Sequence, residues 1–223
     1  MASGRVGDSY GGFRAQLVEA LRQKGIEDLA VLRAVGEVPR HLFVPDAFRQ
    51  RAYEDSALPI GLGQTISQPY VQALSLQALQ LSGRERVLEV GTGSGYQTAL
   101  LTYLADYVVS IERIPELARV ARDNLDAAGI RGAQVVVGDG TLGWRPLAPY
   151  DAIVVAAAGP EVPRPLLDQL AVGGRLVAPR DREGGQVLVR IVRTATDFEE
   201  TVLAGVIFVP LIGRHGRPED ANA

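Results

Sequence analysis

The sequence predicts an α/β fold: a doubly wound, mostly parallel sheet of Rossmann-like type, preceded by N-terminal helices and followed by an antiparallel C-terminal hairpin. Short apolar segments alternate with helical segments from about residue 84 onward, which indicates parallel strands joined by helices. Near the C-terminus two extended segments follow each other with no room for a helix between them. A short connection of that kind favours antiparallel pairing, here at the edge of the parallel sheet.

The N-terminal third is predicted to be helical and then irregular. Apolar residues recur at mostly helical spacing over residues 13–36, with an interruption at Gly25, which predicts two short amphipathic helices. Residues 58–69 have no regular periodicity and are expected to form a loop that either covers a site or packs against the body. A further helix is expected after Pro69, ending near Gly83.

The sheet elements follow in a regular rhythm. Strands are expected at residues 87–90, 107–111, 134–137, 152–156 and 175–178, helices at 98–104, 115–128 and 164–170, and the final hairpin at 186–193 and 201–209. With no internal repeat or linker, residues 1–223 are interpreted as one domain, in which about 13–80 form the N-terminal helices and active-site loop and about 84–213 the cofactor-binding sheet. Both termini are expected to be loose.

Composition excludes several classes of chemistry. The 223 residues are 47% hydrophobic, enough for one sizeable core. The net charge of −3 argues against a protein that coats nucleic acid. Without cysteine, and with His41 and His215 as the only histidines, we expect no metal site, no disulfide and no thiolate nucleophile. No signal peptide or membrane span is visible, so a cytoplasmic protein with no membrane partner is expected. We also expect a monomer.

The chemistry-bearing residues stand at the ends of the predicted strands. Gly91, Gly93 and Gly95 directly follow an apolar strand, where missing side chains let the backbone approach a ligand. Glu112 closes the next strand, where a carboxylate can meet ribose hydroxyls, and Asp139 closes the one after. Each feature alone also fits a structural turn or a helix cap. Together they predict one nucleotide-cofactor site at this edge of the sheet.

The nature of the cofactor follows from spacing. An acidic ribose contact fits NAD as well as S-adenosylmethionine, but the glycines form G-x-G-x-G and not the dinucleotide pattern. A second acid placed for an adenine edge favours S-adenosylmethionine. A dehydrogenase would also need a proton-transfer residue, and such groups are scarce here.

Seven segments resemble one family closely, the protein-L-isoaspartate O-methyltransferases, and the resemblance runs over about residues 13–213. They are residues 38–45, 58–69, 87–95, 137–140, 149–153, 169–176 and 208–211, and the most specific part is Gln-Thr-Ile-Ser-Gln-Pro at residues 64–69. The resemblance implies a cytoplasmic repair enzyme with a class I methyltransferase fold whose last two strands are reordered. It implies transfer of a methyl group from S-adenosylmethionine to the free carboxylate of isoaspartyl residues in damaged proteins and peptides.

The same resemblance implies roles for individual residues. Ser67 matches the active-site serine and is expected to orient the substrate carboxylate, since neither histidine forms a recognisable triad with it. Ile212 stands where some relatives have threonine, and Tyr70 where some have histidine. The residues implied to bind the cofactor are Thr65, Ile66, Ser67 and Tyr70 in the covering segment, Gly91, Thr92, Gly93 and Gly95 on the methionine side, Glu112 and Arg113 at the ribose, and Asp139 and Gly140 at the adenine.

Other interpretations stay open from the sequence. Ser67 could instead cap the helix that begins near Pro69. The chain could be another S-adenosylmethionine-dependent methyltransferase acting on a small molecule or nucleic acid, or a non-catalytic module that binds damaged protein. His41 is expected to make a structural hydrogen bond. Backbone recognition of the substrate by residues 207–211 or 156–158 is a further hypothesis.

Overall fold

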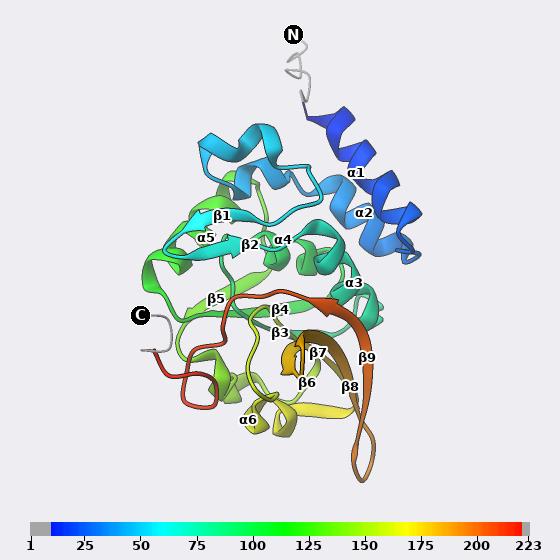
Figure 1. Ribbon diagram of the computed structural model, residues 1–223, viewed down its shortest axis with the longest axis vertical. Helices are drawn as coiled ribbons and strands as arrows, with labels where there is room; N and C mark the ends of the chain where they lie inside the picture. The colour runs from blue at the N-terminus through cyan, green and yellow to red at the C-terminus, as the bar shows by residue number, and fades with distance from the viewer. Residues whose placement is uncertain (1–9, 220–223) are drawn as a thin grey trace.

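The computed structural model describes residues 10–219 and contains a seven-stranded sheet and a small two-stranded sheet (Figure 1). The order in the large sheet is β5-β4-β3-β6-β7-β8-β9, with β3 to β7 parallel and β8 and β9 antiparallel. The strands are β3 Arg86–Val90, β4 Tyr107–Glu112, β5 Ala133–Val137, β6 Tyr150–Val155, β7 Leu170–Arg182, β8 Gly185–Arg193 and β9 Phe198–Val206. The predicted fold class, including the C-terminal hairpin, is confirmed.

The boundaries differ from the prediction mainly in the last three strands. β7 extends on both sides of the expected 175–178, because Leu170 at its start pairs with Tyr150 of β6 and its second half, residues 175–182, pairs with β8. β9 ends at Val206, and residues 207–209, expected to continue it, leave the sheet. The loose termini predicted from the sequence lie largely outside the described residues. Within residues 10–219, no helix is both long and apolar enough to cross a membrane.

The two faces of the sheet are covered unequally. Helices α4 Tyr96–Thr102 and α5 Pro115–Ala127 pack on β4 and β5, and α3 Pro69–Leu79 packs on β6 and β7. The opposite face is covered by the short α6 Arg164–Asp168 and the turns η3 Gly140–Leu142 and η4 Arg145–Leu147. Alternate residues of each strand point to opposite faces, so Val87 and Leu88 belong to different hydrophobic clusters.

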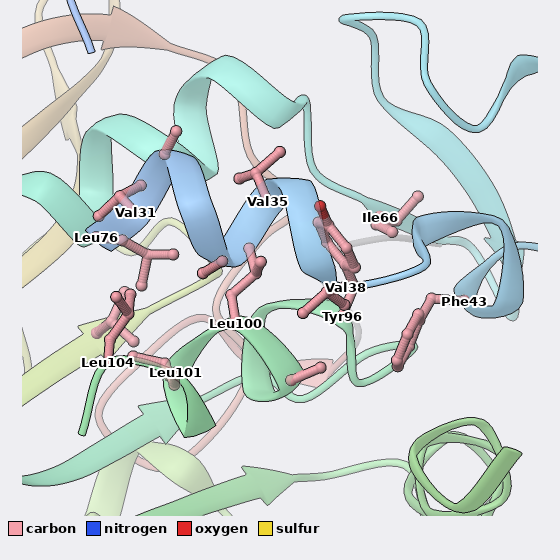
Figure 2. Packing of buried hydrophobic residues seen from close by; sticks show 14 of the residues in the cluster. Val31, Val35, Val38, Phe43, Ile66, Leu76, Tyr96, Leu100, Leu101 and Leu104 are labelled. Atoms are coloured by element: carbon pink, nitrogen blue, oxygen red, sulfur yellow. The ribbon is translucent and has the colours of Figure 1, made fainter. Parts of the chain in front are cut away.

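The N-terminal region forms an additional layer over α3 and α4. It contains α1 Gly11–Gln23, α2 Leu29–Glu37, η1 Arg40–Phe43 and η2 Asp46–Arg51. Figure 2 shows Val31 and Val35 of α2 meeting Leu76 of α3 and Leu100 of α4 in one apolar layer. Asp28 caps α2 by accepting hydrogen bonds from the N–H groups of Ala30 and Val31. Both predicted N-terminal helices are therefore present.

The prediction of a loop over residues 58–69 was wrong in part. Strands β1 Leu58–Gly61 and β2 Gln64–Ile66 form an antiparallel hairpin there, with Leu58 and Ile66 buried. These strands are too short to give an alternating pattern that could be recognised in the sequence. Figure 1 shows the hairpin above the edge of the main sheet at which β3 and β4 end.

Candidate active site

A pocket lies where β3 and β4 end and the β1–β2 hairpin faces the main sheet. β3 is flanked by β4 on one side and β6 on the other, so the order of the strands reverses there, and such a switch point is the usual ligand site of an open α/β sheet. The predicted site residues that line this pocket are Thr65, Ile66, Ser67, Gly91, Thr92, Gly93, Glu112, Arg113 and Gly140.

The glycine loop is fixed by backbone geometry and by one carboxylate. Gly91 has φ 93°, and a Cβ there would lie 3.4 Å from the Cβ of Ala156, which follows the adjacent strand β6. The Gly91 N–H donates to the carbonyl of Ile111 at 2.8 Å, and the Gly93 N–H donates to Oε2 of Glu112 at 2.9 Å. The loop is thus held against the end of β4 with its backbone bordering the pocket.

Glu112 is buried and uses both carboxylate oxygens. Its Oε2 accepts from Gly93, and its Oε1 accepts from the N–H of Ile114 at 3.0 Å, directly before α5. Glu112 therefore joins the glycine loop to the start of the next helix while its side chain lines the pocket. Its predicted contact with ribose stays a prediction.

Three of the predicted residues do not line the pocket, each for an identifiable reason. Gly95 caps α4 with φ 88°, where a Cβ would lie 3.2 Å from the carbonyl oxygen of Ala121 in α5. The Tyr70 N–H donates to Asp55, and the Lys24 ammonium lies 5.7 Å from the centre of the Tyr70 ring. Gly95 and Tyr70 therefore contact neighbouring parts of the protein and do not line the pocket.

Asp139 is the third residue outside the pocket. Its Oδ1 accepts from the N–H and hydroxyl of Thr141 at 2.9 and 2.6 Å, and its Oδ2 accepts from the Arg214 N–H at 2.8 Å. Burial alone would raise the pKa of Asp139, but these hydrogen bonds outweigh it and hold the pKa below its usual value. Asp139 thus ties the C-terminal segment to η3, beside the pocket residue Gly140.

A buried polar network behind the glycine loop was missed from the sequence. Glu89 of β3 accepts hydrogen bonds from Gln97, from Thr98 and from Ser110, and Thr92 shares a hydrogen bond of 2.6 Å with Ser110. Burial raises the pKa of Glu89 to about 7, partly opposed by these donors. Gln97 and Thr92 line the pocket, so the network connects the pocket wall to the core. An acid in an otherwise apolar strand, Val-Leu-Glu-Val, was the signal that could have found it.

The far wall of the pocket comes from the segment after β9. Ala158 and Pro210 form a bridge, in which the Ala158 N–H donates to Val209 and the Leu211 N–H donates to Ala158, at 2.8 and 2.7 Å. The two segments proposed for backbone recognition of substrate therefore pair with each other at this point. Ile212 lines the pocket as a nearly buried apolar side chain, so it provides no hydroxyl there.

Ser67 stands between this pocket and a second, wider groove. Four residues border both cavities, namely Thr65, Ser67, Ala156 and Val209, and the groove continues along Gln68, Val71, Gly184–Gln186 and residues 205–208. Helix α3 begins with Gln68 as its cap residue and without a side-chain cap, so Ser67 does not cap it. Within residues 10–219, the Ser67 hydroxyl has no hydrogen-bond partner.

Neither histidine completes a triad with Ser67. The Nδ1 atom of His41 lies 2.8 Å from the hydroxyl oxygen of Tyr53, and its ring stacks on Tyr10, with the centroids 4.1 Å apart. The predicted structural hydrogen bond of His41 is confirmed. His215 belongs to the C-terminal segment, where its N–H donates to Thr141. Within residues 10–219, no group of His, Cys, Asp and Glu residues could hold a metal ion.

The chain is similar to known proteins over nearly its whole length. The protein-L-isoaspartate O-methyltransferase of Methanoculleus marisnigri is 56% identical over 204 residues, which cover 91% of this chain and 93% of that one. Protein-L-isoaspartate O-methyltransferase 2 of Marinobacter nauticus is 55% identical over 207 residues, covering 92% and 93%.

Solved structures agree with these relatives. One protein-L-isoaspartate O-methyltransferase superposes with a TM-score of 0.84 at 29% identity, covering 91% of this chain and 67% of that one. A putative protein-L-isoaspartate O-methyltransferase from Plasmodium falciparum, in complex with S-adenosyl-L-homocysteine, gives 0.79 at 28% identity, covering 89% and 98%. A family model described as protein-L-isoaspartate(D-aspartate) O-methyltransferase matches residues 13–216. The chain belongs to the protein-L-isoaspartate(D-aspartate) O-methyltransferase family.

Proposed function

We propose that this protein transfers a methyl group from S-adenosylmethionine to the free carboxylate of isoaspartyl residues in damaged proteins and peptides, the first step of their repair. Family membership over residues 13–216 supports the activity. The main structural support for this activity is that two segments line the same pocket. One is the glycine loop, which is typical of cofactor binding, and the other is the Ser67 segment, the most family-specific stretch of the sequence.

The pocket fits the cofactor on its own geometry. Gly91 and Gly93 leave room for a ligand against the backbone, and a Cβ at Gly91 would narrow the space toward Ala156. Glu112 places a carboxylate in the same pocket, and Arg113 borders it. When bound, S-adenosylmethionine supplies an activated methyl group on a sulfonium centre. The residues of this chain hold and orient it and exclude water.

The chemistry needs no strong base from the protein. A carboxylate with an ordinary pKa near 4 is already an anion at neutral pH, so the substrate binds with its nucleophile already deprotonated. What remains is alignment of the carboxylate with the methyl group, and such positioning can lower a barrier by roughly 7–11 kcal/mol in favourable cases. The hydroxyl of Ser67, which has no hydrogen-bond partner among residues 10–219 and lies at the border of pocket and groove, is suited to donate a hydrogen bond to one carboxylate oxygen.

The groove beside Ser67 is the proposed path of the damaged peptide. It is bordered by the backbone of Gly184, Gly185 and Gly205 and by the fully exposed side chain of Ile207. Because Ala158 and residues 209–211 already pair, contacts with the peptide main chain are proposed for residues 205–208 only. Recognition through backbone suits an enzyme whose substrates share a chemical lesion and not a sequence.

The net charge of −3 supports proteins over nucleic acids as substrates. We further propose that the protein acts as a monomer in the cytoplasm, with no membrane partner. Gel filtration coupled to light scattering would check the oligomeric state, and a dimer would overturn that part.

The activity is tested with two synthetic peptides that differ only in one residue, L-isoaspartate in one and L-aspartate in the other, incubated with methyl-labelled S-adenosylmethionine. We expect base-labile methyl esters on the isoaspartyl peptide alone. Methylation of neither peptide, while S-adenosylhomocysteine still binds in calorimetry, would point to another methyltransferase substrate.

A further inference from the structure

Two charged side chains of the N-terminal region hold the Ser67 segment from outside the pocket. Arg40 belongs to η1, and Asp55 lies shortly before β1. Neither lines the pocket, yet both bond directly to the short stretch from Ser67 to Tyr70.

Arg40 is completely buried and connects three walls of the pocket. Its Nε donates to the carbonyl of Ala52, and its two terminal nitrogens donate to Oε1 of Gln72 and to the carbonyl of Ser67, all at 2.9 Å. The guanidinium carbon also lies 4.6 Å from the centre of the Tyr96 ring. Ser67, Gln72 and Tyr96 all line the pocket and come from different elements, the end of β2, α3 and α4.

The burial of this cation needs compensation. Removing a guanidinium from water is costly unless its donors are paired, and no carboxylate lies within ion-pairing distance of Arg40 among the described residues. Burial lowers the pKa of Arg40 to about 10, so the group is still a cation at neutral pH. The fork shape of arginine allows a single side chain to serve three separate acceptors, which lysine cannot reproduce.

Asp55 supplies the cap that α3 lacks. The Oδ1 atom accepts the N–H of Tyr70 at 2.8 Å, one of the N–H groups that a helix leaves unpaired in its first turn. The Oδ2 atom accepts from the side-chain amide of Gln68 at 3.1 Å and from Lys24 at 2.5 Å. Because Asp55 satisfies this turn, the hydroxyl of Ser67 is not needed for capping.

We propose that Arg40 and Asp55 are positioning residues for Ser67: Arg40 fixes its carbonyl, and Asp55 caps the helix that follows, which keeps the Ser67 hydroxyl available to the substrate carboxylate. This inference rests on the proposed function, because it takes Ser67 as the group that meets the substrate.

The test compares Asp55→Ala, Asp55→Asn and Arg40→Lys with the wild type. Asn keeps one oxygen for the Tyr70 N–H, so it should restore most of what Ala removes. Arg51→Met is the matched control, since Arg51 is a half-exposed arginine of the same region whose ion pair is with Glu54 and not with the Ser67 segment. Each protein is assayed for kcat and KM with the isoaspartyl peptide, for S-adenosylhomocysteine affinity by calorimetry, and for hydrogen exchange of residues 64–72.

We expect kcat to fall about tenfold or more in Asp55→Ala and Arg40→Lys, because small misplacements at a reacting centre can cost up to ~100-fold. Affinity for S-adenosylhomocysteine should change by less than about threefold, which is under ~1 kcal/mol. Exchange should rise in residues 64–72 and stay unchanged in residues 91–95.

Three results would overturn the proposal. A folded Asp55→Ala or Arg40→Lys protein with wild-type kcat would show that the substituted residue does not position Ser67. Parallel losses of kcat and affinity, or failure of Arg40→Lys to fold, would assign a purely structural role. If the wild-type protein itself does not methylate the isoaspartyl peptide, the proposed function fails, and the hydrogen-exchange comparison still decides whether Arg40 and Asp55 fix the segment.

Discussion

The glycine loop and the Ser67 segment border the same pocket but are held in different ways. The loop at Gly91–Gly95 is fixed by its neighbours in the sheet, through the carbonyl of Ile111 and the carboxylate of Glu112 at the end of the adjacent strand. The Ser67 segment is fixed by two side chains, Asp55 and Arg40, whose hydrogen bonds to it span 13 to 27 residues of the chain. The pocket wall that contains the glycine loop is therefore held in place by the sheet, and the wall that contains Ser67 is held in place by the N-terminal layer.

This difference suggests a division of work. The wall made by the sheet is proposed to bind the cofactor, and the wall made by the N-terminal layer to meet the substrate. Changes on the two sides should then separate cofactor affinity from turnover.

The largest effect on cofactor affinity is expected for Glu112→Ala. The change removes the acceptor of the Gly93 and Ile114 N–H groups together with the proposed ribose contact. Hydrogen bonds to a charged group contribute about 1.5–3 kcal/mol, so affinity for S-adenosylhomocysteine should fall roughly ten- to hundredfold in calorimetry. Glu116→Ala, an exposed acid of the first turn of α5, is the control, and equal affinities for the two variants would contradict the assignment.

A smaller loss is expected for Gly91→Ala. Gly91 and Gly129 both have positive φ, but only Gly91 borders the pocket, while a Cβ at Gly129 would meet nothing within 4 Å. Backbone strain of about 1–2 kcal/mol should lower the stability of both variants similarly. Only Gly91→Ala should also lose affinity, by about tenfold, or ~1.4 kcal/mol. Wild-type affinity in Gly91→Ala would mean that the loop backbone does not contact the ligand.

Asp139→Ala should have a moderate effect through the C-terminal segment. Loss of its carboxylate releases the Arg214 N–H and Thr141, and hence the segment that brings Ile212 to the pocket. We expect about a fivefold loss of affinity, corresponding to ~1 kcal/mol for a typical net hydrogen bond. Faster hydrogen exchange in residues 211–217 should accompany it. Affinity loss without faster exchange would instead favour a direct contact of Asp139 with adenine.

The smallest effect on binding, but a clear one on stability, is expected for Glu89→Gln. Burial raises the pKa of Glu89 from 4.5 to about 7 in the folded protein. Its contribution to stability is therefore complete below about pH 4.5 and is lost as the pH rises through 7. Because the Gln variant does not ionise, its stability relative to wild type should increase between pH 5 and pH 8, by on the order of 3 kcal/mol at most. Urea unfolding at both pH values measures the free energy of unfolding of the two proteins. If the difference between Glu89→Gln and wild type is the same at pH 5 and pH 8, Glu89 does not ionise between these pH values.

The same division explains how far the sequence could predict the site. The glycine loop and Glu112 were predictable because strand ends converge in a parallel sheet, and an apolar run followed by glycines or an acid marks each end. Thr65, Ile66 and Ser67 were located only through the family resemblance. Nothing in local spacing places residue 67 opposite residue 91, since the hairpin that brings it there is too short to leave a pattern.

The misses have physical causes as well. Asp139 stands where a cofactor acid was expected, and its contact with adenine stays a prediction. No pattern in the sequence indicated that its carboxylate also accepts the backbone N–H of Arg214, 75 residues later in the chain. Gln72 and Tyr96 reach the pocket from two different helices, through packing that no periodicity encodes. Arg40 looked like part of a motif without a role, because its three acceptors are known only once the chain has folded.

The most direct test of the division between the two walls is a paired measurement on Ser67→Ala: kcat with the isoaspartyl peptide and the dissociation constant for S-adenosylhomocysteine by calorimetry, each beside Glu112→Ala. We expect Ser67→Ala to lower kcat while leaving the dissociation constant close to wild type, and Glu112→Ala to raise the dissociation constant. Equal losses of kcat and affinity in Ser67→Ala would contradict the account and make the serine a structural part of the cofactor site.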